Sequence, residues 1–412
     1  MKLSINKSFL LNICILMLIF VAPLSVALTN IFVGLVILLW IVEGNFKEKF
    51  NKLKNLNKAL VFFLLIYVLQ FVSLLWSDSI YTGGYWSGYY NNAIDFLLRH
   101  EFFYLIVALI VYTSFKKEWT QKAINVFIAV MLISEIVSYG IIFGLWTTKK
   151  GHIGDPSPFL NHSAYSALLA WTIFLLLEKF FRVKNIYYKS FYGFFITTAT
   201  LNLFLNTGRT GQLVFIVLLI FYIIEKFKLS WKSILFSFLG VSLMIGLNYK
   251  FNKTFNNRVN QAINDIKLIN QQNYASSWGL RYLSILLSKK CLDTNPFFGY
   301  GFGDAKKEVM LEVEKYDEKS AQAYKRKLNP HMHNQYLQFF NEIGLVGIFL
   351  LLAFFYFYFK TNFSDEIKII AHLFMIDYVI IFFTGTFLRR ESTFILFLIF
   401  TTIFLLNKKE KS

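Results

Sequence analysis

Apolar runs of near-membrane-spanning length recur along this 412-residue chain, and short stretches of turn-forming or charged residues separate them. About 20 apolar residues in a helix cross the hydrocarbon core of a bilayer. The pattern therefore predicts an all-α polytopic membrane protein with about twelve transmembrane helices. The predicted segments are 9–27, 29–42, 59–76, 96–114, 123–146, 161–181, 191–206, 211–225, 233–248, 341–359, 367–388 and 392–407.

Basic residues are distributed unevenly between the predicted loops. If the amino terminus is cytoplasmic, the cytoplasmic segments hold 22 lysines and arginines, and the short external loops hold five. Short cytoplasmic loops of membrane proteins carry such an excess, so we expect both termini in the cytoplasm. We interpret the first thirty residues as a retained first helix and not as a cleaved signal peptide, because further spans follow.

One external segment, about residues 249–340, is far longer than a usual connection between elements. Within it, 255–271 and 305–327 place apolar residues at helical spacing, so we expect two helices that lie on the membrane surface. The predicted organisation is nine transmembrane helices in 1–248, a large external loop domain in 249–340, and three helices with a short cytoplasmic tail in 341–412. We expect the loop domain to hold functional residues that act outside the cytoplasm.

Composition supports the same class of protein. Hydrophobic residues make up 56% of the chain and charged residues only 16%, against about 25% charged in soluble domains. This excludes an ordinary cytosolic enzyme. The net charge of +18 is explained mainly by topology-fixing residues beside spans, so no nucleic-acid partner is expected. Two distant cysteines, Cys14 and Cys291, cannot build a dense disulfide framework or a thiolate metal cage.

The first polar motif at the external face is Asn206-Thr207-Gly208-Arg209-Thr210-Gly211. Placing an arginine so near the membrane costs free energy, and such an arginine usually has an anionic partner. The flanking glycines permit a sharp turn and would leave backbone N–H groups open for phosphate. The alternative is a topology-fixing arginine that reaches the lipid headgroups.

The second motif is Trp278-Gly279-Leu280-Arg281, followed by the glycine-rich stretch from Asn295 to Asp304. The stretch lacks the lysine and hydroxyl residue of a P-loop and the strand that precedes a dinucleotide fold, so we do not expect a nucleotide. Arg281 is either a second anion-binding residue or a solvated helix residue.

The third motif, His331-Met332-His333-Asn334, stands at the mouth of a predicted membrane helix. Imidazole titrates nearest to neutral pH, which favours proton transfer there. No carboxylate or cysteine completes a metal site at ligand spacing, so no metal is expected. The pair Arg389 and Arg390 lies in an external loop on the same side and could support binding of a pyrophosphate or a core phosphate.

Two further groups are interpreted as structural. Asn161 or Ser163 is expected to cap the sixth span, in preference to a catalytic role for His162. Asp95, Arg99 and Glu101 are expected to pair across one helical turn.

His333-Asn334, nine residues and then Gly344-x-x-Gly347 resembles the signature of the O-antigen ligase family. Arg209 in Thr-Gly-Arg-Thr-Gly resembles the family's arginine at the membrane face. Arg281, ahead of Asn-Pro-Phe-Phe-Gly-Tyr-Gly, resembles the arginine in its large periplasmic loop. Ile348 departs from the signature, which usually has a smaller or polar residue there, so the choice between ligase and related enzymes stays open.

The resemblance implies a membrane-embedded, GT-C-like glycosyltransferase on the periplasmic side of a Gram-negative inner membrane, with no metal or other cofactor. Its donor would be a glycan on undecaprenyl diphosphate, its acceptor a sugar hydroxyl of lipid A–core, and its product lipopolysaccharide. His333 would be the general base, and Arg209 and Arg281 would bind the pyrophosphate. Supporting roles would fall to His331, Asn334, Arg389 and Arg390.

Other functions have to be weighed against this one. O-antigen polymerases and bacterial protein O-oligosaccharyltransferases are relatives that use the same kind of donor. A flippase or transporter of lipid-linked saccharide would instead spread charges through the bilayer midplane, whereas this chain concentrates its polar motifs at the external face. The ligase interpretation predicts that His333, Arg209 and Arg281 gather in one pocket that opens to the periplasm.

Overall fold

The computed structural model describes residues 6–78, 92–227, 246, 249–250, 253–327 and 332–409. Throughout these residues the regular secondary structure is helical, apart from isolated β-bridges between His152 and Asp155 and between Phe363 and Lys408. The predicted all-α class is therefore confirmed. His331 lies outside the described residues, and so does the predicted segment 233–248 apart from residue 246.

The first half of the chain forms helices that follow the predicted apolar segments closely. They are α1 Lys7–Val21, α2 Val26–Glu43, α3 Phe46–Lys54, α4 Lys58–Val72, η1 Ser73–Trp76, α5 Ala93–Phe96, the π-helical η3 Leu97–Phe102, α6 Phe103–Ser114, η4 Lys117–Trp119, α7 Thr120–Ile142, α8 His162–Arg182, α9 Ile186–Leu205 and α10 Arg209–Phe227. The second half contributes α12 Lys253–Asn270, α13 Ser277–Thr294, α14 Ala305–Val313, α15 Glu318–Lys327, α16 Gln335–Phe359, α17 Lys368–Thr384, η5 Phe387–Arg389 and α18 Glu391–Leu406.

Within the residues that the structure describes, five stretches of helix are long and apolar enough to cross a membrane: α2, α4 with η1, η4 with α7, α8, and α16. The shorter helices α1 and α18 are also apolar. Large apolar side chains such as Ile31, Leu38 and Ile41 of α2 are exposed, as expected for a surface that faces lipid. The chain is thus a membrane protein, while the count of twelve spans and the GT-C-like architecture stay predictions.

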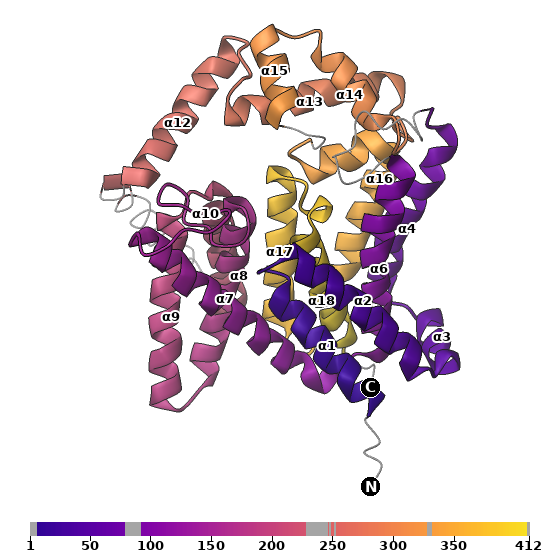
Figure 1. Cartoon of the computed structure of the whole chain (residues 1–412), viewed down its shortest axis with the longest axis vertical. Helices are drawn as coiled ribbons and strands as arrows, with labels where there is room; N and C mark the ends of the chain where they lie inside the picture. The colour runs from indigo at the N-terminus through magenta and orange to yellow at the C-terminus, as the bar shows by residue number, and fades with distance from the viewer. Residues whose placement is uncertain are drawn as a thin grey trace.

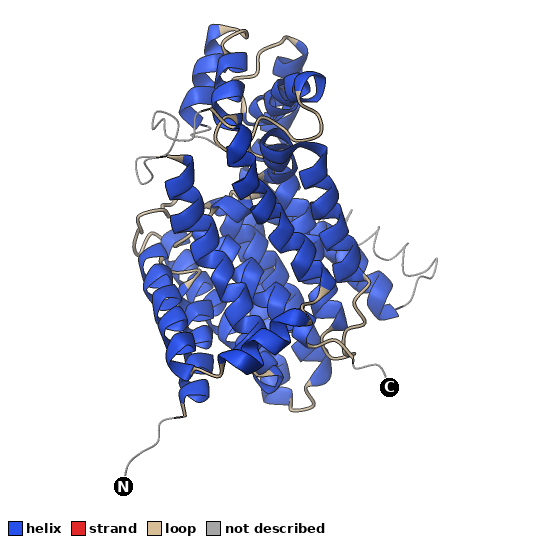
Figure 2. Ribbon diagram, turned by 90° about the vertical axis from the view of Figure 1, so that its right-hand side faces the viewer, coloured by secondary structure: helices blue, strands red, loops and turns tan. Residues whose placement is uncertain are grey.

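The membrane helices pack around α18, which is buried from Ser392 to Leu405. Helix α4 packs on α16, α6 on α18, and α10 and α9 on α8. Helices α12 to α15 lie together at one end of the molecule, and the start of α1 and the end of α18 lie at the other (Figure 1). A side view shows the same long bundle of helices (Figure 2).

The described part of the long segment 249–340 holds its own small core. Val309 and Val313 of α14 pack with Leu283 and Leu287 of α13 and with Tyr324 of α15. The predicted single helix over 305–327 is therefore two helices. The second one begins anew because the Asp317 carboxylate accepts a hydrogen bond from the Ser320 N–H at 2.9 Å and caps it.

Helix α16 contains a kink that explains one glycine of the sequence motif. Ile343 and Gly344 leave helical geometry, and Gly344 has φ of 64°. The Leu345 N–H donates to the Pro296 carbonyl at 2.8 Å, and the Tyr300 N–H donates to the Asn341 carbonyl at 2.9 Å. The glycine-rich turn thus packs on the kink. Gly344 is left-handed there and lies in close contact with the turn, so this position needs glycine.

Candidate active site

Arg209 is the first residue of α10, and its neighbouring glycines set how closely α10 approaches α8. A side chain on Gly211 would begin 2.3 Å from the Ser166 backbone, so only glycine fits. The Gly208 N–H donates to Asn206 Oδ1 at 2.8 Å, and the Gly211 N–H donates to Ser166 Oγ at 3.2 Å. The expectation that these N–H groups are open for phosphate is therefore wrong. The predicted phosphate binding by this motif then rests on the Arg209 guanidinium alone.

Helix α12 connects the two arginines of the sequence motifs. Arg209 Nη2 donates to Gln261 Oε1 of α12 at 3.2 Å. One turn further along α12, Asp265 Oδ2 accepts the Trp278 N–H of α13 at 3.2 Å. This arrangement brings Arg281, on the next turn of α13, into electrostatic range of Arg209.

Arg281 is held in a setting that favours an anion. Its Nη1 donates to the carbonyl and the hydroxyl of Ser277 at 3.1 and 3.0 Å. Its Nε is buried and has no hydrogen-bond partner among the described residues. Burial and the charge of Arg209 lower the pKa of Arg281, with Asp265 opposing them. An anion between the two guanidinium groups would offset this repulsion and satisfy the buried donor.

Two cavities adjoin at this point. The larger, of about 720 Å³, is lined by Arg209, Arg281 and the apolar side chains of Leu213, Trp278 and Phe383. The smaller, of about 370 Å³, is lined by Arg281 again and by other polar residues. Residues that line both cavities are His162, Ser163, Ser277, Arg281 and Thr384. Arg281 therefore faces both spaces.

His333 lines the smaller cavity from the start of α16. Its φ of 47° is left-handed, which is uncommon for a residue with a side chain. The following residue, Asn334, caps α16, because its Oδ1 accepts the N–H groups of Tyr336 and Leu337 at 2.9 and 3.1 Å. Asn334 itself lines neither cavity.

The two neighbouring arginines between α17 and α18 lie in different places. Arg390 lines the smaller cavity, and its Nη1 donates to Asn161 Oδ1 at 2.9 Å. Arg389 lines neither cavity. Its buried guanidinium pairs with Glu101 and with Glu342, the latter at 2.6 Å. Arg390 is thus the only one of the two placed to support a substrate.

The predicted local pairing of the π-helical region is only half right. Asp95 and Arg99 pair across one turn at 3.1 Å, as expected. Glu101 pairs instead with Arg389, nearly three hundred residues away. A contact between positions so far apart leaves no periodic signal in a single sequence.

His162 lies at the candidate site, although no catalytic role is predicted for it from the sequence. Asn161 does cap α8, since its Oδ1 accepts the Ala164 N–H at 3.0 Å. His162, however, lines both cavities, and its Nδ1 lies 3.1 Å from Asp155 Oδ2. Burial acts to raise the pKa of Asp155, but hydrogen bonds from His162 and Ser157 outweigh it and hold this pKa at about 2. An ionised carboxylate thus orients the imidazole.

Metal-ligating side chains do not gather anywhere in the described ranges: no three His, Cys, Asp or Glu residues there could hold one ion together. Cys14 and Cys291 are free thiols. The polar groups that do converge are two imidazoles and three guanidinium groups, from His162, His333, Arg209, Arg281 and Arg390.

Comparison with known proteins supports the resemblance seen in the sequence. Residues 193–352 match the family described as O-antigen ligase, and a search of curated proteins finds no match. The matched segment contains Arg209, Arg281, His333 and both glycines of the motif that ends at Gly347. This family implies an enzyme of the glycosyltransferase type. Residues 193–352 are therefore similar to the O-antigen ligase family.

Proposed function

We propose that this protein is an O-antigen ligase of a Gram-negative inner membrane. It transfers a glycan from undecaprenyl diphosphate to a sugar hydroxyl of lipid A–core on the periplasmic side. The observation that carries the proposal is the convergence of His333, Arg209 and Arg281 on two adjoining cavities that share Arg281. No nucleotide is needed, because the lipid diphosphate is already an activated leaving group.

The two cavities suit different substrates. The larger one combines two guanidinium groups with the apolar side chains of Leu213, Trp278 and Phe383, which fits a diphosphate attached to a polyprenyl chain. The smaller one holds His333, Arg390 and hydrogen-bonding groups, which fits a sugar with phosphate substituents. We therefore assign the larger cavity to the donor and the smaller one to the acceptor.

The proposed reaction is a direct displacement at the anomeric carbon. His333 accepts the proton of the acceptor hydroxyl while its oxygen forms the new bond to that carbon. The bond from the anomeric carbon to the diphosphate oxygen breaks, and the electron pair leaves with undecaprenyl diphosphate. Arg209 and Arg281 stabilise the charge that develops on the leaving group. Such a displacement inverts the anomeric configuration.

The arrangement of the chain supports a periplasmic site. Helices α12–α15 lie at one end, and the described termini lie at the opposite end (Figure 1). Basic residues predominate in the loops at the end with the termini, which favours placing that end in the cytoplasm.

Transport of a lipid-linked saccharide is less well supported. Glu135 and Asp377 are buried within α7 and α17, and neither residue lines the two cavities of the site. A polymerase or a protein O-oligosaccharyltransferase would share the donor cavity and differ in the acceptor. Which acceptor is glycosylated is therefore the measurement that separates the ligase from these relatives.

Arg281→Ala and Arg209→Ala are each expected to lower kcat/KM for the lipid-linked donor by about 10- to 150-fold. One charge-assisted hydrogen bond is worth about 1.5–3 kcal/mol, and both side chains are assigned to the diphosphate. Kinetics with purified donor measure the effect. Arg326→Ala is the matched control, since Arg326 is exposed on α15 and lines neither cavity. Normal kinetics of Arg281→Ala would remove the donor assignment.

His162→Gln and Asp155→Asn are expected to lower the transfer rate about tenfold, less than loss of the base, because the pair orients an imidazole that lines both cavities. The pKa of Asp155 lies below its ordinary value of 3.8, so its pairing stabilises the fold above that pH and is lost only as pH falls toward 2. Asp155 is thus ionised at neutral pH. Equal activity of both variants and wild type would assign this pair to loop structure alone.

A further inference from the structure

A third cavity, of about 380 Å³, lies at the other end of the helices that form the candidate active site. Helix α8 contributes His162 at its start to the active site and Lys179 near its end to this cavity. Helix α17 likewise contributes Thr384 at its end to the active site and Ile370 near its start to the cavity. The two spaces therefore face opposite sides of the membrane in the proposed topology.

Two of the four charged residues that line this cavity are satisfied within the protein. Glu178 accepts hydrogen bonds from Tyr222 at 2.9 Å, Lys226 at 2.8 Å and Arg182 at 3.1 Å. Arg182 also donates to the backbone carbonyl of Glu366 at 2.9 Å. These contacts fix the end of α8 to the residues just before α17.

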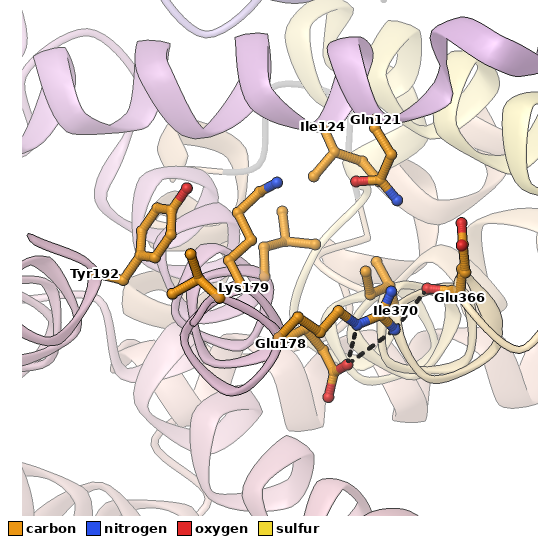
Figure 3. Close-up of a pocket in the computed structure, with 10 residues that line it drawn as sticks. Gln121, Ile124, Glu178, Lys179, Tyr192, Glu366 and Ile370 are labelled. Carbon is orange, nitrogen blue, oxygen red and sulfur yellow. Dashed lines mark hydrogen bonds and ion pairs between the residues drawn. The ribbon is translucent and has the colours of Figure 1, made fainter. Parts of the chain in front are cut away.

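The other two charges have opposite sign and remain available. Within the described residues, neither the Lys179 ammonium nor the Glu366 carboxylate has a hydrogen-bond or ion-pair partner, and the same holds for the hydrogen-bonding groups of the Gln121 and Tyr192 side chains. Figure 3 shows Lys179 and Tyr192 on one side of the opening and Glu366 on the other, with Gln121 above them. The cavity thus presents a cation and an anion on opposite sides, together with two neutral hydrogen-bonding side chains.

The surroundings place this cavity at the boundary between lipid and water. Apolar residues Ile124, Leu175 and Ile370 form part of its lining. Tyr187 and Tyr188, at the start of α9 beside Tyr192, are strongly exposed. Exposed tyrosines gather where membrane helices leave the hydrocarbon core, because one end of the ring is apolar and the other is polar. A ligand in this cavity would therefore reach it from the membrane.

We propose that this cavity binds the headgroup of a zwitterionic phospholipid, with the phosphate on Lys179 and a primary ammonium on Glu366. Gln121 and Tyr192 would donate further hydrogen bonds to the phosphate oxygens. An ethanolamine headgroup satisfies both charges at once. A glycerol headgroup leaves Glu366 without a cation, and a choline headgroup lacks the N–H donors that a carboxylate binds. The proposal does not depend on the glycosyl transfer reaction.

Native mass spectrometry of the purified full-length protein tests this with three lipids of identical acyl chains: phosphatidylethanolamine, phosphatidylglycerol and phosphatidylcholine. We expect phosphatidylethanolamine to bind about tenfold more tightly than either of the others, the worth of one charge-assisted hydrogen bond. Lys179→Ala and Glu366→Gln should each lower its binding by a similar factor. Glu366→Gln should also abolish the discrimination against phosphatidylglycerol, while Lys179→Ala should not.

Matched controls lie close by. Lys184→Ala and Glu118→Gln remove exposed charges at the same end of the molecule that do not line the cavity, and they should leave lipid binding unchanged. Equal binding of all three lipids to the wild type would overturn the proposal, as would binding that neither cavity variant reduces. Free phosphoethanolamine that binds as tightly as the lipid would overturn the lipid as ligand and indicate a soluble one.

Discussion

Replacing His333 with alanine is expected to lower the rate of glycan transfer about 10²–10⁴-fold, because the acceptor hydroxyl loses the base that takes its proton. Donor binding should change little, since the diphosphate is assigned to Arg209 and Arg281. Single-turnover kinetics with lipid-linked donor separate the two effects. The control His152→Ala removes an exposed imidazole that lines neither cavity.

The backbone at His333 requires a second variant. Its left-handed φ of 47° costs alanine about 1–2 kcal/mol, whereas asparagine adopts this conformation readily. His333→Asn therefore keeps the backbone and removes the base. Transfer at the wild-type rate by His333→Asn would remove the proposed base, whatever the alanine variant does.

Replacing Arg389 with alanine is expected to destabilise the protein by about 3–5 kcal/mol, the usual cost of breaking a buried ion pair. The change leaves Glu101 and Glu342 buried without their cation. Glu342 also accepts hydrogen bonds from Gln70 and Gln338, each at 2.6 Å, so four elements depend on this network. Thermal unfolding in detergent and the amount of protein in the membrane measure the effect.

A compensated variant tests the cause of that loss. Arg389→Met combined with Glu101→Gln and Glu342→Gln removes all three charges together, and it should recover much of the stability. Arg390→Ala is the single-site control, because this neighbouring arginine pairs with no carboxylate in the described part of the chain. Wild-type stability of Arg389→Ala would show that the network contributes little to folding.

The sequence was sufficient to predict the helices, including the helix ends that border the candidate site. The apolar runs and the cap at Asn161 are local signals, and helices occur at all eleven predicted segments that lie within the described residues. The sequence was sufficient to predict three candidate site residues, Arg209, Arg281 and His333, because each lies in a short motif beside one of those helix ends. The prediction placed all three in one pocket, whereas the structure places them on two adjoining cavities that share Arg281.

What the sequence did not reveal depends on contacts between distant segments. The role of Arg389 follows from partners on η3 and α16, and that of Gly211 follows from the approach of α8. The pairing of Asp155 with His162 depends on a loop that folds back through the bridge between His152 and Asp155. None of these contacts has a periodicity that one sequence would display.

The most direct test of the central claim is complementation of a bacterial strain that lacks its own O-antigen ligase, followed by gel analysis of its lipopolysaccharide. The account predicts that the wild-type chain restores lipopolysaccharide carrying O-antigen. It also predicts that His333→Asn, at equal abundance in the membrane, leaves unligated lipid A–core and accumulated lipid-linked glycan. Restoration of O-antigen by His333→Asn to the wild-type level would contradict it, and so would longer lipid-linked glycans without any ligation by the wild type.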